Sequence, residues 1–165
     1  MGGNRRRSFE AGHRLKFLVV ADESAECVRA IHFAARRAGR IGAGIIMLAV
    51  TEAVDFQHWL GVGDVMKAEA EDKARALLER YASIGRSLAG IEPEMVVRSG
   101  SKAEEIRALI EADADISFLV LAAGTSAEGP GPLVSLLAGK AAGSFPIPVV
   151  IVPGGLSDAE IDALA

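Results

Sequence analysis

The sequence has few of the features that mark secreted, membrane-spanning or nucleic-acid-binding proteins. Its single cysteine, Cys27, cannot form a disulfide within the chain, which favours a reducing cytoplasm over secretion. No apolar run approaches the roughly 18 residues that a membrane helix needs. The 22 acidic residues outnumber the 18 basic ones, and the net charge of −4 argues against a broad positive surface for nucleic acid. We therefore expect a cytoplasmic protein that binds neither membrane nor nucleic acid.

Aromatic residues are also scarce, at 5% of the chain, whereas Ala, Val, Leu and Ile are abundant. This composition favours packing of small residues between helices and a sheet over an aromatic-rich β-sandwich. The length of 165 residues corresponds to about one domain. We interpret residues 1–13 as a flexible polar tail in which Arg5 to Arg7 have no assigned role. Residues 14–153 form the expected α/β domain, and residues 154–165 are a C-terminal extension.

Strand-like and helix-like segments alternate along this domain. Apolar runs predict strands at 14–21, 45–50, 94–98, 116–122 and 149–152, and the charged flanks of the third indicate an edge strand. Helical periodicity predicts helices from Ser24 to about Gly39, from Asp64, from Ser101 and over 133–142. In the first helix, an apolar stripe of Cys27, Ile31, Ala34 and Ala38 is expected to lie on the sheet, while Arg29, Arg36 and Arg37 face water. In the second helix, the apolar stripe is expected to begin at Met66. Capping boxes are expected at SKAE (101–104) and SDAE (157–160).

This alternation predicts a three-layer α/β/α domain with an open, parallel, five-stranded sheet. Ligands in such sheets bind at the carboxyl ends of the strands, where the direction of winding reverses. If the strand order is 3-2-1-4-5, strands one and four flank that reversal. Asp22 and Gly124 would then face each other across one crevice.

The fourth predicted strand runs into a loop that contains Gly124, Gly129 and Gly131. Glycines after a buried strand let backbone N–H groups approach an anion, commonly phosphate. The same loop contains two prolines and Glu128. Each proline removes a donor and the carboxylate repels phosphate, so the loop both indicates a nucleotide site and weakens it.

Three segments together resemble the universal stress protein family over about Lys16 to Pro153. They are FLVVADESAECVRAIHFAARRA, VVRSGSKAEEIRALIEADADISFLVLAAG and PIPVVIV. The resemblance implies the strand order 3-2-1-4-5, a dimer through the fifth strand and, in some members, ATP binding. The apolar edge strand Val149–Val152 independently favours pairing with a second copy, although the turn after Gly155 could cover that edge instead.

The resemblance also assigns roles to single positions. Asp22 matches the aspartate that contacts the nucleoside, and Val50 matches the residue beside the adenine. The family's phosphate-binding glycine motif is degenerate in this chain, because two of its glycines are displaced and a serine-leucine pair replaces its glycine-serine pair. The candidate nucleotide-binding residues are Asp22, Val50, Gly124, Thr125, Gly129, Gly131 and Ser135. Purely structural roles stay open, since Asp22 could cap the first helix and Ser135 could be a helix-start hydroxyl.

Three functions are compatible with these patterns. The first is a homodimeric stress-response module whose crevice holds ATP, another adenine nucleotide or a related small ligand without turnover. The second is an apo protein-interaction dimer whose acidic C-terminal tail docks on an unknown partner. An enzyme is least favoured, with slow ATP hydrolysis at most, because the chain lacks the HxGH-type histidine pair and a GxSxG turn.

Two other features have mainly structural interpretations. The histidines His13, His32 and His58 are widely spaced and predict no metal site. Phe56–Gly63, which includes the only tryptophan, either covers the edge of the core or forms a lid over the crevice.

Overall fold

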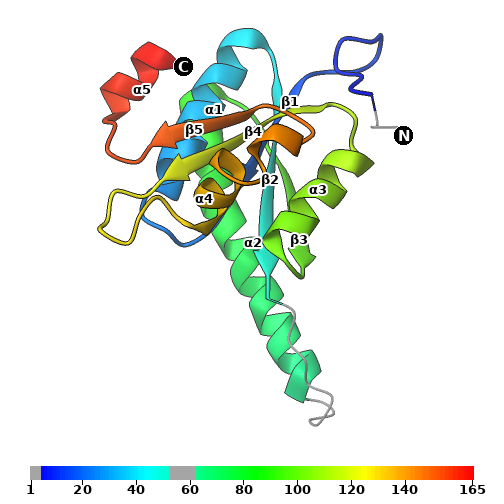
Figure 1. Ribbon diagram of the computed structural model, residues 1–165. Helices are drawn as coiled ribbons and strands as arrows, with labels where there is room; N and C mark the ends of the chain where they lie inside the picture. The colour runs from blue at the N-terminus through cyan, green and yellow to red at the C-terminus, as the bar shows by residue number, and fades with distance from the viewer. Residues whose placement is uncertain (1–4, 53–61) are drawn as a thin grey trace.

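The computed structural model describes residues 5–52 and 62–165, which form a five-stranded parallel sheet covered by helices on both faces (Figure 1). In chain order the elements are β1 Lys16–Val20, α1 Cys27–Ile41, β2 Gly44–Thr51, α2 Val62–Ala89, β3 Glu94–Ser99, α3 Lys102–Ala112, β4 Ile116–Ala123, α4 Pro132–Ala138, the short 3₁₀ helix η1 Ala142–Ser144, β5 Val149–Pro153 and α5 Asp158–Leu164. The strand order β3-β2-β1-β4-β5, with every neighbouring pair parallel, confirms the predicted fold. Residues 56–61 of the predicted lid or cover lie outside the described residues.

Alternate side chains of the central strands build two hydrophobic layers. Phe17, Val19 and Met47 pack beneath α1 and α2. On the opposite face, Leu18 and Leu48 pack beneath α3 and α4. Because β1 and β2 are buried on both faces, their sequences are continuous apolar runs without the polar alternation of a half-exposed strand.

The predicted buried stripe of α1 is confirmed. Cys27, Ile31, Ala34 and Ala38 are all buried against the sheet and against α2. The edge position of β3 is also confirmed, since this strand pairs only with β2 and most of its side chains are exposed. The alanines on α1 let this helix pack closely against the sheet, and the low aromatic content of the sequence indicated such packing of small residues.

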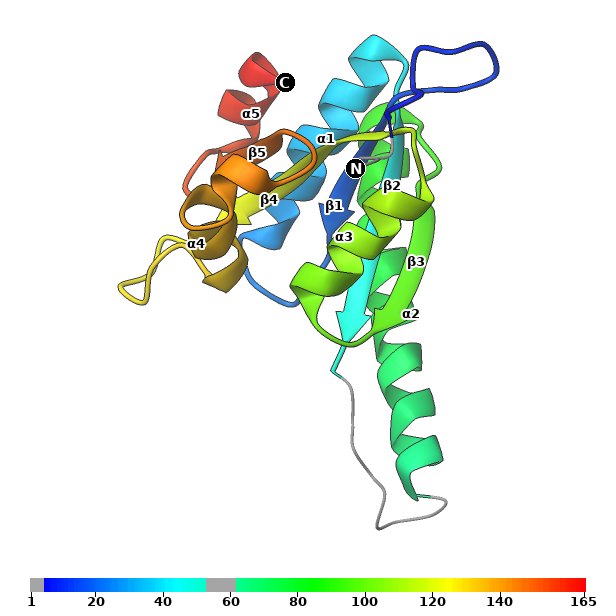
Figure 2. The ribbon, with the colours of Figure 1, turned by 45° about the vertical axis from the view of Figure 1, so that its right-hand side comes forward.

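Helix α2 is longer than the sheet that it covers (Figure 2). Its 28 residues span about 42 Å, at about 1.5 Å per residue, and its N-terminal turns extend beyond the ends of the strands. Val65 and Met66 in this part are 57% and 44% exposed, whereas burial begins at Ala74. The expectation that Met66 belongs to the buried stripe is therefore wrong, because none of the described strands reaches the first turns of the helix.

Only one of the two predicted capping serines bonds to the helix that it precedes. The hydroxyl of Ser157 accepts a 3.1 Å hydrogen bond from the backbone N–H of Glu160 and caps α5. Ser101 precedes α3 but makes no side-chain capping bond. Its side chain is exposed, so water can satisfy its hydroxyl.

Residues 5–13 dock on the domain, in contrast to the flexible tail that the sequence indicates. Arg6 donates hydrogen bonds of 2.7 and 3.0 Å to two carbonyl groups at the C-terminal end of α3. His13 lies 2.7 Å from the carboxylate of Asp115, and Ser8 is buried. The segment is ordered because Arg6 satisfies carbonyl groups that have no partner within the helix.

The C-terminal extension folds back onto α1. Asp158 contacts Arg29, and Asp162 contacts both Arg36, at 2.8 Å, and His32, at 2.7 Å. The expectation that Arg29 and Arg36 simply face water is therefore wrong. Strand β5 remains the outer strand of the sheet and pairs with β4 alone among the described strands. None of the helices in the described ranges is long and apolar enough to cross a bilayer.

Candidate functional site

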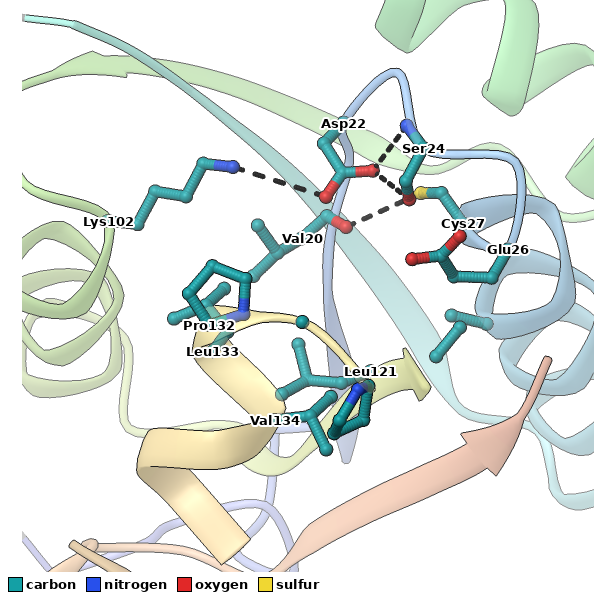
Figure 3. A pocket seen from close by; sticks show the side chains of 14 residues that line it. Val20, Asp22, Ser24, Glu26, Cys27, Lys102, Leu121, Pro132, Leu133 and Val134 are labelled. Atoms are coloured by element: carbon teal, nitrogen blue, oxygen red, sulfur yellow. Dashed lines mark hydrogen bonds and ion pairs between the residues drawn. The ribbon is translucent and has the colours of Figure 1, made fainter. Parts of the chain in front are cut away.

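A crevice opens at the carboxyl ends of β1 and β4, where the winding of the sheet reverses (Figure 3). It has a volume of about 150 Å³. Its apolar wall includes Val20, Leu121 and Val134, and its polar rim includes Asp22 and Lys102. This position is the general ligand site of open α/β sheets, so the topology itself directs attention to the crevice.

Asp22 is held by the turn that joins β1 to α1. Its Oδ1 accepts hydrogen bonds from the backbone N–H of Ser24, at 2.9 Å, and from the hydroxyl of the same serine. Helix α1 begins five residues later, at Cys27, without a side-chain cap. Asp22 therefore stabilises the turn and does not cap the helix. Its second oxygen, Oδ2, faces Lys102 Nζ across the crevice at 4.0 Å (Figure 3).

Two buried side chains, Tyr81 and Cys27, donate hydrogen bonds to main-chain carbonyls in and just before this turn. The hydroxyl of Tyr81, on α2, donates a 2.8 Å hydrogen bond to the main-chain carbonyl of Asp22, and burial raises the pKa of Tyr81 to about 12. The thiol of Cys27 donates to the carbonyl of Val20 at 3.6 Å. Burial also raises the pKa of Cys27, which keeps the thiol neutral and makes it a small wall residue, without the thiolate character of a nucleophile.

The glycine loop forms a separate recess beside the crevice. This recess is lined by the five predicted phosphate-side residues Gly124, Thr125, Gly129, Gly131 and Ser135. The N–H of Gly124 donates to the carbonyl of Pro130, and the N–H of Gly129 donates to that of Ser126. Gly129 and Gly131 have φ values of 98° and 108°, which favour glycine for the turn itself. The loop thus uses its glycines and two of its donors to hold its own shape.

Val50 lines neither the crevice nor the recess. It lies near the end of β2, one strand further from β4, and packs with the hydrophobic layer beneath α3. The structure therefore brings Asp22 to the crevice and the glycine-loop residues to the adjoining recess, with Gly131 lining both, and it leaves Val50 outside both. Within the described parts of the chain, no group of three or more His, Cys, Asp or Glu side chains is arranged to hold a metal ion.

Glu26 is a site residue that the sequence patterns did not indicate. It lines both the crevice and the recess and so lies at the passage between them. Its Oε1 is 3.0 Å from the point that a Cβ on Gly124 would occupy. The sequence did contain a signal, because Glu26 follows Asp22 by four residues at the carboxyl end of the same strand. Lys102, the first residue of α3, is another crevice residue that the sequence patterns did not indicate.

Comparisons with known proteins agree with the fold. The sequence matches the model of the Universal stress protein family over residues 13–153. The universal stress protein UspA from Lactobacillus plantarum is 16% identical, with a TM-score of 0.67 over 84% of this chain and 97% of that one. No curated relative matches the sequence at a significant level.

Two further structures with this fold contain adenine nucleotides. A universal stress protein family protein from Arabidopsis thaliana with AMP bound is 17% identical, with a TM-score of 0.55 over 84% of this chain and 91% of that one. The universal stress protein from Archaeoglobus fulgidus in complex with dAMP is 18% identical, with a TM-score of 0.51 over 84% and 97%. At these identities the likeness shows the shared fold.

Proposed function

Because the chain belongs to the universal stress protein family, we propose that it is a cytoplasmic stress-response module whose crevice binds an adenine nucleotide or a related small ligand without turnover. The observation that carries this proposal is the crevice between β1 and β4 with Asp22 on its rim. The crevice lies at the reversal of the sheet winding, where ligands of such sheets bind, and Asp22 lies at its rim, where a nucleoside is expected.

The chemistry of the crevice suits part of such a ligand. The apolar side chains of Val20, Leu121 and Val134 would contact the base, and Asp22 Oδ2 would accept a hydrogen bond from a ribose hydroxyl. The volume of about 150 Å³ is well below the about 300 to 1,000 Å³ of typical small-molecule sites. The crevice as it stands therefore accommodates a nucleoside fragment, and the rest of a nucleotide would extend toward the glycine loop. AMP and dAMP in the two relatives are monophosphates.

Binding without turnover is supported by the groups that line the crevice. No histidine is among them, and burial keeps the thiol of Cys27 neutral. Covalent catalysis requires a nucleophile activated by a neighbouring base or by a lowered pKa. The thiol of Cys27 meets neither condition, because its pKa is raised and it donates to a main-chain carbonyl.

A homodimer through β5 is the second part of the proposal. The outer edge of this strand offers unpaired backbone groups, and the side chains of Val149, Val150 and Ile151 are only half-buried. Edges of this kind are generally covered or paired with another strand. Sedimentation at micromolar concentration should give the mass of two chains, whereas a monomer mass would contradict this part.

Calorimetric titration with adenosine, AMP, ADP and ATP tests the binding proposal. We expect saturable binding of at least one of the four, and weaker binding in Asp22→Asn. Glu23→Gln is a matched control, because it removes a neighbouring carboxylate that is exposed and lines neither the crevice nor the recess. Absence of heat with all four ligands, from a folded protein, would contradict the proposal.

That negative result would favour the alternative of an apo protein-interaction dimer. One observation supports this alternative, since the glycine loop directs the N–H groups of Gly124 and Gly129 to its own carbonyls. The acidic C-terminal segment, however, is already engaged by the basic side chains of α1. A protein partner would therefore have to displace α5 or bind elsewhere.

A further inference from the structure

The two sides of the site differ in charge. On the crevice side, the negative charge of Asp22 is partly offset by Lys102. On the loop side, Glu26 and Glu128 both line the recess, and no lysine or arginine is among its lining residues. A ligand group that extends from the crevice toward the glycine loop therefore approaches two carboxylates without a compensating cation.

Packing places Glu26 at this position. A Cβ on Gly154 would lie 3.1 Å from the Cβ of Glu26, so the base of the side chain is confined by the turn after β5. At the other end, the missing side chain of Gly124 leaves room for the Glu26 carboxylate, which a Cβ there would approach to 3.0 Å. Gly124 in this chain therefore makes space for a carboxylate at a point where a phosphate would otherwise approach the backbone.

The Glu26 carboxylate has no hydrogen-bond or ion-pair partner among the described residues, and its side chain is partly buried. A carboxylate in this state gains from any ligand group that donates a hydrogen bond or carries a positive charge. A phosphate offers neither and adds like-charge repulsion. Between groups a few ångströms apart near a protein surface, this repulsion weakens affinity by on the order of tenfold or more.

We propose that Glu26 is a specificity-determining residue that selects the ligand by charge. The site favours nucleosides whose group facing the glycine loop is a hydroxyl or an ammonium, and it discriminates against the phosphorylated forms. This inference rests on the proposed function, because it concerns the ligand class of the same crevice.

A ligand series that varies only this group provides the test. Adenosine, 5′-amino-5′-deoxyadenosine, AMP and ATP are titrated into the native protein and into Glu26→Gln. For the native protein we expect adenosine and its amino derivative to bind at least about tenfold more tightly than AMP, with ATP weakest. In Glu26→Gln, AMP should gain about tenfold and the amino derivative should lose affinity, while adenosine changes by less than about threefold.

Two further variants make the result specific. Glu23→Gln removes the same charge from an exposed position outside the site and should leave the ratio of adenosine to AMP affinity unchanged. Gly124→Ala places a methyl group against the Glu26 carboxylate and should shift this ratio as well, by displacing the carboxylate. It provides a second route if Glu26→Gln does not fold, as judged by circular dichroism.

The outcomes separate the inference from the function on which it rests. If AMP binds the native protein as tightly as adenosine, or if neither Glu26→Gln nor Gly124→Ala changes the ratio, charge selection by Glu26 is wrong and nucleoside binding stands. If none of the four ligands binds, the proposed function is wrong and the inference with it.

Discussion

The hydroxyl of Tyr81 and the main-chain carbonyl of Asp22 are joined by a 2.8 Å hydrogen bond. This bond connects the C-terminal half of α2 to the turn that carries the aspartate of the crevice. Tyr81 is 3% exposed, so its hydroxyl has little access to water as an alternative partner. The bond therefore couples the stability of the core to the geometry of the site.

Replacing Tyr81 by Phe should destabilise the protein and loosen the turn. The aromatic ring and its packing remain, so the loss is that of one hydrogen bond, about 0.5–1.5 kcal/mol in the free energy of unfolding. Urea denaturation measures this change, and adenosine titration measures any accompanying loss of affinity. Unchanged stability would show that the bond contributes nothing to the native state.

The same residue predicts a loss of stability at alkaline pH. Burial raises the pKa of Tyr81 to about 12, whereas an exposed tyrosine titrates at about 10. A raised pKa means that the neutral phenol favours the folded state, so its contribution is fully present below pH 10 and is lost as pH rises through about 12. Tyr81 is the only tyrosine, so phenolate absorbance reports it alone. A native midpoint equal to that of the urea-unfolded chain would contradict this assignment.

The two adjacent glycines after β5 should differ in their tolerance of alanine. A Cβ on Gly154 would lie 2.3 Å from the main-chain oxygen of Ala123, which cannot move independently of β4. We expect Gly154→Ala to cost about 1–3 kcal/mol of stability. Gly155→Ala is the matched control, because its Cβ would meet Thr125 at an ordinary 3.7 Å, and its stability should change by less than about 0.5 kcal/mol. Equal melting temperatures for the two variants would refute this expectation.

The contact between α5 and α1 should weaken in acid. The hydrogen bond from His32 and that from Arg36 hold the pKa of Asp162 below its ordinary value. A lowered pKa means that the carboxylate stabilises the folded state above the ordinary pKa of about 4, and that this contribution is lost as pH falls through the lower value.

Asp162→Asn should therefore lower the melting temperature at pH 7 and reduce the further loss that the native protein shows near pH 3. Glu160→Gln is the matched control, because Glu160 lies on the same helix, is exposed and forms no ion pair in the described structure. Circular dichroism at the two pH values measures both effects. If the two variants melt alike at pH 7, Asp162 does not hold the helix in place.

The strands and the buried face of α1 could be predicted because their signals are local. β1 and β4 are central strands, and burial on both faces leaves continuous apolar runs that are visible in the sequence. The spacing of Cys27, Ile31, Ala34 and Ala38 likewise follows from one helix packing on one sheet. The location of the crevice then follows from the strand order.

The remaining features depend on residues that are distant in the sequence. Asp162 and Arg36 are 126 positions apart, so no local pattern connects them. The position of Glu26 depends on Gly124 and Gly154, which meet it only after the sheet has formed. The exposed start of α2 was misread for a related reason, because helical periodicity does not indicate where the neighbouring strands end.

Cys27 gives this molecule a built-in reporter. Its Sγ bonds to the carbonyl of Val20 and is the only thiol of the chain. Cys27 is 4% exposed and lines the crevice, so the rate at which a thiol reagent modifies it reports on motion of the crevice wall. A nucleoside seated against this wall should slow the labelling, whereas urea should make it immediate. Ligand engagement can thus be followed on the unaltered protein, without an attached dye.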